Sequence, residues 1–369
     1  MPLIGDYERV LRRREDSYVG DQKASDPVNE RHKALVTAPV SGPGLELLSE
    51  LAELVIDPWI DQSPIRIYNA EQLAERASAE GADILVVEAD TCAGPVLELP
   101  LVAVASCRGD PTNVDVGGAT AAGIPVLRAP GRNADAVAEL AVALLLAASR
   151  GINRAEQDVR SGQVYRDGTI PYQRFRAWQI AGRTAGLVGL GAVGRALRWR
   201  LEGLGMRVVA YDPYAPDATC SLERLLEVSD VVSLHAPVTA ETTGMIASGE
   251  FAQMREGVIF LNTARAQLHD GAALVEALES GKVGAAGLDH FVGENLALDD
   301  PLLGFSNVVL TPHIGGATYD TESNHTSTIA DDLCRLLAGA TPRNIVNPEV
   351  LADRVSSPAI TAPAGKTIG

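Results

Sequence analysis

Three glycines in the pattern G-x-G-x-x-G, Gly189, Gly191 and Gly194, stand between an apolar run and a stretch with helical periodicity. The run TAGLVGL predicts a strand. The helix that follows would bury a face made of Val193, Leu197, Leu201 and Leu204. A strand, a tight turn and a helix in this order let a pyrophosphate approach the backbone and sit at the helix N-terminus. The next strand, RVVAY, ends at Asp212, whose carboxylate can hold a ribose diol. The segment therefore predicts a dinucleotide site rather than glycines that merely tighten a turn.

Short β-rich runs alternate with helical patterns along most of the 369 residues. In a first series, which starts at residue 34, strands are predicted at ALVTAPV, ELVIDPW, ADILVVEAD, PLVAVAS and IPVLRAP. A second series of six runs, from TAGLVGL to NVVLTPH, follows an apolar helix predicted from Asn133 to Arg150 and a polar connector. The chain is longer than one ordinary core supports, and the alternation favours parallel sheets covered by helices. The sequence therefore predicts two α/β domains.

The charge of the chain excludes several classes of partner. A net charge of −17 is unfavourable for nucleic acid, which requires a basic face, and for an anionic membrane surface. The apolar run ELAVALLLAAS is too short to cross a bilayer, and the N-terminus MPLIGDYERVLRRRED lacks the apolar region of a secretory signal. We therefore expect a cytoplasmic protein with no nucleic-acid or membrane partner.

The four cysteines, Cys92, Cys107, Cys220 and Cys334, are far apart and form no C-x-x-C pair. This spacing suggests neither a disulfide framework nor a zinc site. We expect reduced, mostly structural thiols and no bound metal.

Three reactive side chains follow strands of the second series. Arg265 comes after GVIFLN, Glu294 after GAAGLD and His313 after NVVLTP. His313 stands behind a proline and before two glycines, which is a poor setting for a packing residue. Each side chain alone could be solvated. Because ligands bind beyond the carboxyl ends of strands in an open α/β sheet, we expect the three to share one edge. A guanidinium, a carboxylate and an imidazole are what hydride transfer to a 2-oxo acid needs.

These residues lie in segments that resemble the D-isomer-specific 2-hydroxyacid dehydrogenases, in particular the phosphoglycerate-dehydrogenase-like group. The resemblance runs in family order from about residue 113 to residue 351. It includes GLVGLGAVGRALRWRLEGLGMRVVAYDPY, SDVVSLHAPVTAETTGMI, PLLGFSNVVLTPHIGGAT and NIVNPEVL. Residues 34–112 fit the family more loosely, and residues 1–33 do not match it.

The resemblance implies a discontinuous arrangement of domains. A Rossmann doubly wound parallel sheet over residues 129–318 would bind NAD and be inserted into a smaller, flavodoxin-like α/β substrate domain. That second domain would be formed by residues 34–128 and 319–350. The charged extension 1–33 and the tail 351–369 would lie outside both. The resemblance also implies a homodimer, paired through the helix from Asn133 and the arm that follows it.

The resemblance further implies an NAD-dependent reaction between a 2-hydroxy acid and its 2-oxo acid. Arg265 would bind the substrate carboxylate and polarise the carbonyl, His313 would supply the proton, and Glu294 would hold the imidazole in its protonated form. Besides the glycines and Asp212, the positions expected to contact the cofactor are Val193, His235, Thr242, Thr263 and Asp289. The loop expected to bind the substrate carboxylate is formed by Arg108, Gly109 and Asp110.

Three positions depart from the family pattern. Ala266 replaces the usual glycine after the arginine, Asn295 replaces the proline after the glutamate, and His290 replaces the valine of Asp-Val-Phe. These departures leave the three reactive groups in place. An alternative is an NAD-sensing binding protein like the transcriptional corepressors that resemble this family, because these also keep the three groups. Formate dehydrogenase is disfavoured, since it pairs its histidine with glutamine rather than with a residue such as Glu294.

Overall fold

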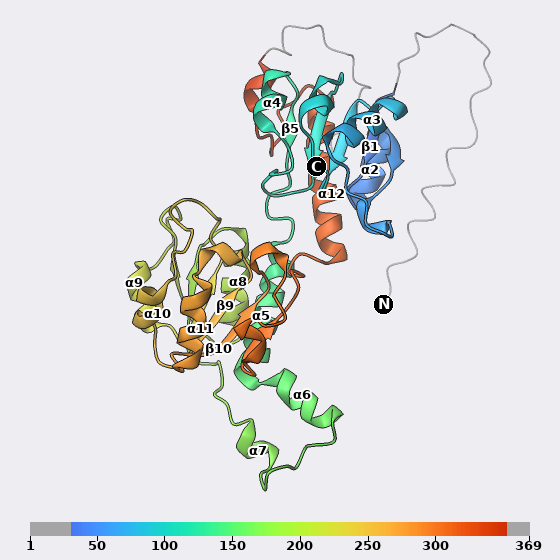
Figure 1. Cartoon of the computed structure of the whole chain (residues 1–369). Helices are drawn as coiled ribbons and strands as arrows, with labels where there is room; N and C mark the ends of the chain where they lie inside the picture. The colour runs from blue at the N-terminus through green and yellow to red at the C-terminus, as the bar shows by residue number, and fades with distance from the viewer. Residues whose placement is uncertain (1–30, 353–369) are drawn as a thin grey trace, which may run out of the picture.

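The computed structural model describes residues 31–352 and contains two parallel sheets, each covered by helices on both faces (Figure 1). The predicted α/β fold class is confirmed. Nearly all of the predicted tail and of the predicted N-terminal extension lies outside the described residues.

The first sheet has five parallel strands in the order β2-β1-β3-β4-β5. Its strands are β1 (Lys33–Val36), β2 (Glu53–Ile56), β3 (Ile84–Val87), β4 (Ala103–Ser106) and β5 (Val126–Leu127). The central strands β3 and β4 are buried along their whole length, as expected for strands with helices on both faces. On one face lie α3 (Ala70–Glu80), α4 (Val116–Ala121) and the 3-10 turn Gly94–Glu98. Asn69 and Gln72 form a capping box at the start of α3, and Gly81 ends this helix in a left-handed conformation.

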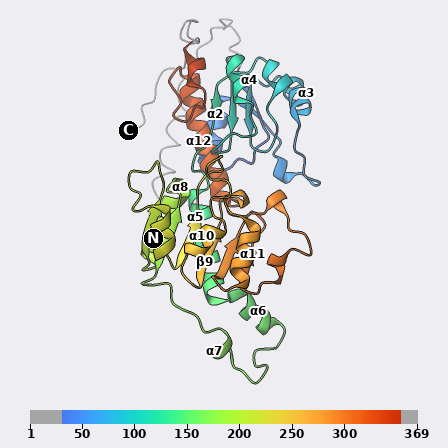
Figure 2. The same cartoon turned by 60° about the vertical axis from the view of Figure 1, so that its left-hand side comes forward.

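The other face of this sheet is covered by two helices that are far apart in the sequence, α2 (Pro43–Leu51) and α12 (Tyr319–Leu337). The two helices pack closely, because a Cβ atom at Gly44 would lie 2.4 Å from the backbone nitrogen of Ser327. After α12 the chain pairs Ile345 with Leu127 in an antiparallel bridge. The side-chain oxygen of Asn347 accepts a hydrogen bond from the backbone N–H of Val126 at 2.8 Å. The helix α12 and the segment after it therefore pack on the same sheet as the first described residues, as both views show (Figure 2).

The second sheet has six parallel strands in the order β11-β10-β9-β8-β6-β7. They are β6 (Thr184–Val188), β7 (Arg207–Tyr211), β8 (Val231–Leu234), β9 (Val258–Asn262), β10 (Val283–Leu288) and β11 (Val308–Leu310). The chain starts this sheet at β6 and adds β7 on one side of it, and then adds β8 to β11 on the other side. The direction in which strands are added therefore reverses between β6 and β8. The common dinucleotide-binding order instead places two strands beyond the first. The carboxyl ends of β6 and β8 flank the switch point, where ligands bind in open α/β sheets.

Helices of the second sheet are α5 (Ala134–Arg150) and α8 (Ala192–Gly203) on one face, and α9 (Leu222–Val228), α10 (Ser248–Gln253) and α11 (Gly271–Glu279) on the other. Short 3-10 turns occur at Trp59–Asp61, Ala266–Leu268, Val292–Glu294, Pro301–Gly304 and Pro348–Leu351. The predicted apolar helix is α5, whose last turn is closed by Gly151 in a left-handed conformation.

The connector between α5 and β6 forms an arm that leaves the body of the molecule at the lower end of Figure 1. It contains α6 (Ile152–Arg160) and α7 (Pro171–Arg174), two helices that the sequence pattern had not predicted. Its exposed large side chains are Ile152, Val159, Tyr165, Ile170, Tyr172 and Trp178. Several large exposed apolar side chains on one projecting element are typical of a surface that contacts another protein.

Among residues 31–352 no helix is both long enough and apolar enough to cross a membrane. All four cysteines are free thiols. Burial raises the pKa of the Cys92 thiol to about 12, which makes this side chain an unreactive packing group.

Candidate active site

The glycine turn connects β6 to α8 at the switch point of the second sheet. Gly189 has a φ of 100°, and a Cβ atom there would lie 2.6 Å from the backbone carbon of His235. A Cβ atom at Gly194 would lie 2.2 Å from the carbonyl oxygen of Gly189. A Cβ atom at Gly191, by contrast, would meet no heavy atom within 4 Å. Two glycines are therefore required for strand–helix packing, and the third leaves open space in front of the helix N-terminus.

Asp212 follows β7 and reaches back to this turn. Its carboxylate accepts hydrogen bonds from the backbone N–H of Leu190 at 2.7 Å and of Tyr214 at 2.9 Å. Asp212 thus fixes the turn in addition to the ribose-binding role expected for it. A carboxylate has about four acceptor positions, so two of them remain for a diol.

Two buried polar atoms at the carboxyl edge of this sheet lack a partner in the described part of the chain. They are Nδ1 of His235, which follows β8, and Oγ1 of Thr263, which follows β9. Burial lowers the pKa of His235 to about 4, and its Nε2 lies 2.8 Å from Oγ of Ser233. Buried polar atoms are rarely left unsatisfied, so this edge of the sheet fits a polar ligand such as a dinucleotide.

Two more of the predicted cofactor positions, Thr242 and Val193, have contacts within the protein. The hydroxyl of Thr242 donates to the carbonyl of Pro237 at 2.6 Å and accepts from the backbone N–H of Thr239 at 2.7 Å. Val193 is half-buried and packs against the core beneath α8. Both residues are therefore held in place by contacts within the protein.

His313 and Glu294 are brought together although 19 residues separate them. Nδ1 of His313 lies 2.9 Å from Oε2 of Glu294, and both side chains are substantially exposed. Both residues have positive φ angles, 54° for His313 and 59° for Glu294, which non-glycine residues rarely adopt. Such strain is typical of functional positions that the surrounding structure holds in place.

Asp289 supplies much of that support. Its buried carboxylate accepts hydrogen bonds from the backbone N–H groups of Ile314 at 2.9 Å and Gly315 at 2.8 Å. It also accepts one from the hydroxyl of Thr311 at 2.7 Å. These contacts fix the loop on both sides of His313. A Cβ atom at Gly315 would lie 3.0 Å from the Asp289 carboxylate, which explains one of the two glycines after the histidine.

Arg265 follows β9 and is exposed, with no hydrogen bond to the His313–Glu294 pair. Its guanidinium donates to the carbonyl of Ala264 at 2.6 Å. The buried Asn262 shapes this turn by donating to the carbonyl of Arg265 at 2.8 Å and accepting from the N–H of Ala264 at 3.0 Å. Burial lowers the pKa of His290 to about 4, and the charges of His313 and Arg265 lower it further, so the Arg265 guanidinium lies near the same group of residues.

The residues of the second sheet thus place an imidazole, a carboxylate and a guanidinium at the carboxyl edge that also carries the glycine turn. Residues 142–315 match the model of the D-isomer specific 2-hydroxyacid dehydrogenase, NAD binding domain. The glyoxylate reductase of Korarchaeum cryptofilum is 36% identical over 340 residues, covering 87% of this chain and 98% of the relative. The chain belongs to the D-isomer-specific 2-hydroxyacid dehydrogenase family.

A second relative is the D-3-phosphoglycerate dehydrogenase of Archaeoglobus fulgidus, 41% identical over 243 residues. The match covers 64% of this chain and 45% of that enzyme, so the chain spans about half the length of this relative. Among solved structures, the D-lactate dehydrogenase of Escherichia coli superposes with a TM-score of 0.68 at 28% identity, covering 85% of this chain and 99% of that one. The family match and these relatives support NAD-linked oxidoreduction of a hydroxy acid.

In this dehydrogenase the loop after β4 carries Arg108, Gly109 and Asp110. Nε of Arg108 donates to the carbonyl of Glu88 at 2.6 Å, and its Nη1 donates to the hydroxyl of Thr112 at 3.0 Å. Burial lowers the pKa of Arg108, and the charges of Arg132 and Arg265 lower it further. Arg108 and Arg265 come from different sheets, so the two sheets bring cationic groups near one another.

The sequence reasoning missed one cluster at the junction of the two sheets. Arg132 forms an ion pair with Glu88, and its Nη1 lies 2.8 Å from Nδ1 of His325 in α12. Nε2 of His325 lies 2.6 Å from the carbonyl oxygen of Pro39. Because these residues stand in four distant segments, no local pattern could have identified the cluster. The cluster links the start of α5 to α12 and to the segments that follow β1 and β3 of the first sheet.

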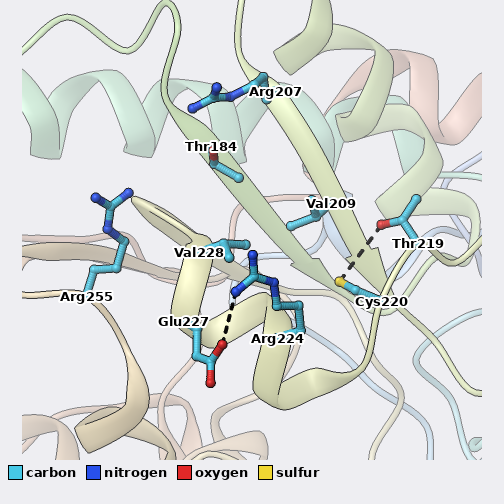
Figure 3. A pocket seen from close by; sticks show the side chains of 9 residues that line it. All are labelled: Thr184, Arg207, Val209, Thr219, Cys220, Arg224, Glu227, Val228 and Arg255. Carbon is cyan, nitrogen blue, oxygen red and sulfur yellow. Dashed lines mark hydrogen bonds and ion pairs between the residues drawn. The ribbon is translucent and has the colours of Figure 1, made fainter.

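A separate pocket of about 630 Å³ lies away from these residues (Figure 3). It is lined by Thr184 and Arg207, the first residues of β6 and β7, and so lies at the opposite end of these strands from the glycine turn. Figure 3 shows the Arg224 side chain directed at Glu227, to which it donates at 3.2 Å. The pocket does not belong to the candidate active site.

Lowering the pH is expected to destabilise the dehydrogenase between about pH 6.5 and pH 4. Burial lowers the pKa of both His235 and His269 to about 4, although Asp270 opposes this effect at His269. In the unfolded chain the same rings take up a proton below about pH 6.5. The unfolded state therefore binds more protons across this window, and the free energy of unfolding falls as the pH falls, by up to about 1.4 kcal/mol per pH unit for each histidine.

Urea denaturation at pH 6.5, 5.5 and 5.0 measures this slope. The variant His269→Gln removes one of the titrating groups and should make the slope shallower by up to about 1.4 kcal/mol per pH unit. An unchanged slope in the variant would show that His269 takes up its proton equally well in the folded protein.

Proposed function

We propose that His313 is the acid and base of the reaction and that Glu294 positions it. The contact of 2.9 Å between Nδ1 of His313 and the Glu294 carboxylate carries this proposal. With Nδ1 directed at the carboxylate, Nε2 is the nitrogen left to face a substrate. A positioned imidazole can donate the proton that turns a carbonyl oxygen into a hydroxyl, and accept it in the reverse direction. NAD, when bound, supplies or accepts the hydride.

Arg265 is proposed to bind the carboxylate of the 2-oxo acid and to polarise its carbonyl. A guanidinium presents paired N–H donors that match a carboxylate, and its positive charge stabilises charge that develops on the neighbouring oxygen. The support for this role is its place after β9, its exposure, and its influence on the nearby His290.

The proposed cofactor contacts are the glycine turn with Val193, Asp212, His235, Thr242, Thr263 and Asp289. The unsatisfied atoms of His235 and Thr263 and the open space at Gly191 support this proposal. We propose that residues 129–318 act as the NAD-binding domain and that residues 34–128 with 319–350 act as the substrate domain. The packing of α12 on α2 supports the second assignment. We further propose a cytoplasmic homodimer, for which the exposed apolar side chains of the arm provide the contact surface.

We propose that the loop of Arg108, Gly109 and Asp110 binds the anionic substrate and that a second anionic group on it improves binding. The charges of Arg132 and Arg265 act on Arg108, and Glu88 is the acidic partner of Arg132. A phosphorylated or dicarboxylic 2-oxo acid should therefore give a lower KM than pyruvate.

A panel of 2-oxo acids with NADH, followed at 340 nm, tests this function. Turnover of at least one 2-oxo acid is expected, with dianionic compounds preferred and the preference lost in Arg108→Ala. If NADH binds tightly but no 2-oxo acid is reduced, the chain would instead be an NAD-sensing binding protein.

The cofactor preference is expected to favour NADH over NADPH by at least about tenfold in kcat/KM. Asp212 would repel a 2′-phosphate, and the nearby Arg195 is already paired with Asp217. Asp212→Asn keeps an acceptor for the N–H of Leu190 while removing the charge, so it should narrow the preference. Equal efficiency with both cofactors in the unmodified protein would contradict the role of Asp212.

A further inference from the structure

His290 stands where the family pattern has valine, and the function proposed above gives it no part. Its side chain is 4% exposed, and its Nδ1 has no partner among the described residues. Its ring centroid lies 3.9 Å from that of His313, with an angle of 53° between the planes. A buried imidazole with an unsatisfied nitrogen directly beside a second imidazole requires an explanation beyond packing.

The two imidazoles share their surroundings with Glu294. One nitrogen of His290, one nitrogen of His313 and one carboxylate oxygen of Glu294 all lie within 4.8 Å of one another. Two histidines and one carboxylate form a common ligand set for divalent transition ions, and a fourth position stays open for water or another ligand. We propose that His290, Glu294 and His313 form a binding site for a zinc-type divalent ion.

The arrangement can adjust to such an ion. Zinc binds imidazole nitrogen and carboxylate oxygen at about 2.0 to 2.2 Å, so the three ligand atoms must move closer together. His290 is buried and provides a fixed ligand, whereas His313 and Glu294 are exposed enough to move toward it. Imidazole-rich sites favour zinc, cobalt or nickel, whereas magnesium and calcium prefer oxygen ligands. The site is therefore selective for the first group.

Occupation of this site would inhibit the dehydrogenase. The ion takes lone pairs of His313 and Glu294 that otherwise hold a proton between them, so the imidazole can no longer exchange its proton with substrate. This inhibition rests on the proposed role of His313, whereas ion binding itself does not. Binding and inhibition are therefore measured separately.

Binding is tested with the full-length chain, freed of any affinity tag and of metal, by calorimetric titration with zinc chloride and by the visible absorbance of added cobalt. One ion per chain is expected, with no comparable binding of magnesium. His290→Val should weaken zinc binding at least about tenfold, as should Glu294→Gln. The matched control is His32→Asn, because His32 also pairs with a carboxylate, that of Asp83, but lies on the first sheet. This control should leave the affinity unchanged.

Equal zinc affinity in the unmodified chain, His290→Val and Glu294→Gln would overturn the site, as would a loss of affinity in His32→Asn alone. If His290→Val fails to fold, Glu294→Gln decides the question, because Glu294 is exposed and its replacement disturbs no core.

For inhibition, NADH oxidation is compared with and without zinc within each variant. Inhibition that EDTA reverses is expected in the unmodified chain, and the same zinc concentration dependence in His290→Val would contradict inhibition through this site.

Discussion

Replacement of His313 by alanine is expected to lower kcat/KM for 2-oxo acid reduction by about 10² to 10⁴. The imidazole of His313 lies beside the Glu294 carboxylate at the carboxyl edge of the sheet and has a nitrogen left to face substrate. Without it, water must supply the proton to the carbonyl oxygen. Steady-state kinetics with the best substrate of the panel, at a fixed saturating NADH concentration, measures the loss.

Two measurements separate this role from a structural one. The dissociation constant of NADH, followed by fluorescence, should change little in His313→Ala, because the glycine turn lies at other strand ends. Glu294→Gln keeps the shape and a hydrogen-bond acceptor for the ring, so it should lose less activity than His313→Ala. An activity loss of less than about tenfold in His313→Ala would reject the imidazole as the proton donor.

Alanine at Gly194 is expected to destabilise the chain by about 3 kcal/mol. The added Cβ atom would lie 2.2 Å from the carbonyl oxygen of Gly189, and backbone cannot move aside as a flexible side chain can. The helix α8 would have to shift away from β6. Urea denaturation measures the change, and NADH binding should be lost with it.

Gly191→Ala is the matched control in the same turn. Gly191 has a φ of −73°, which alanine adopts readily, and its Cβ atom would meet open space. Stability should therefore change little, while the NADH dissociation constant rises about tenfold or more because the methyl group occupies the space left for the pyrophosphate. If Gly191→Ala binds NADH as tightly as the unmodified chain, the pyrophosphate does not approach this glycine.

The local patterns of the sequence predict most of the helices and strands and show which reactive side chains follow the strands. Strand, turn and helix around Gly189 are encoded within a few dozen residues, and reactive residues that follow parallel strands necessarily share one edge of the sheet. The family resemblance rests on segments that are contiguous in sequence. It implies NAD as the cofactor and a reaction between a 2-hydroxy acid and its 2-oxo acid. The arm helices α6 and α7 were not predicted, since short polar helices carry little hydrophobic periodicity.

Tertiary structure alone decided how those groups are held. Asp289 was expected beside the cofactor, but it also fixes the loop of His313 through two backbone N–H groups that no sequence pattern reveals. His313, whose φ angle is positive, lies within the loop that these contacts fix. The contact between His290 and His313 likewise arises where two strand ends meet. The sequence determines which side chains stand at each strand end, because periodicity and turns are local. The contacts between these side chains depend on packing between segments far apart in the chain, and only the folded structure specifies that packing.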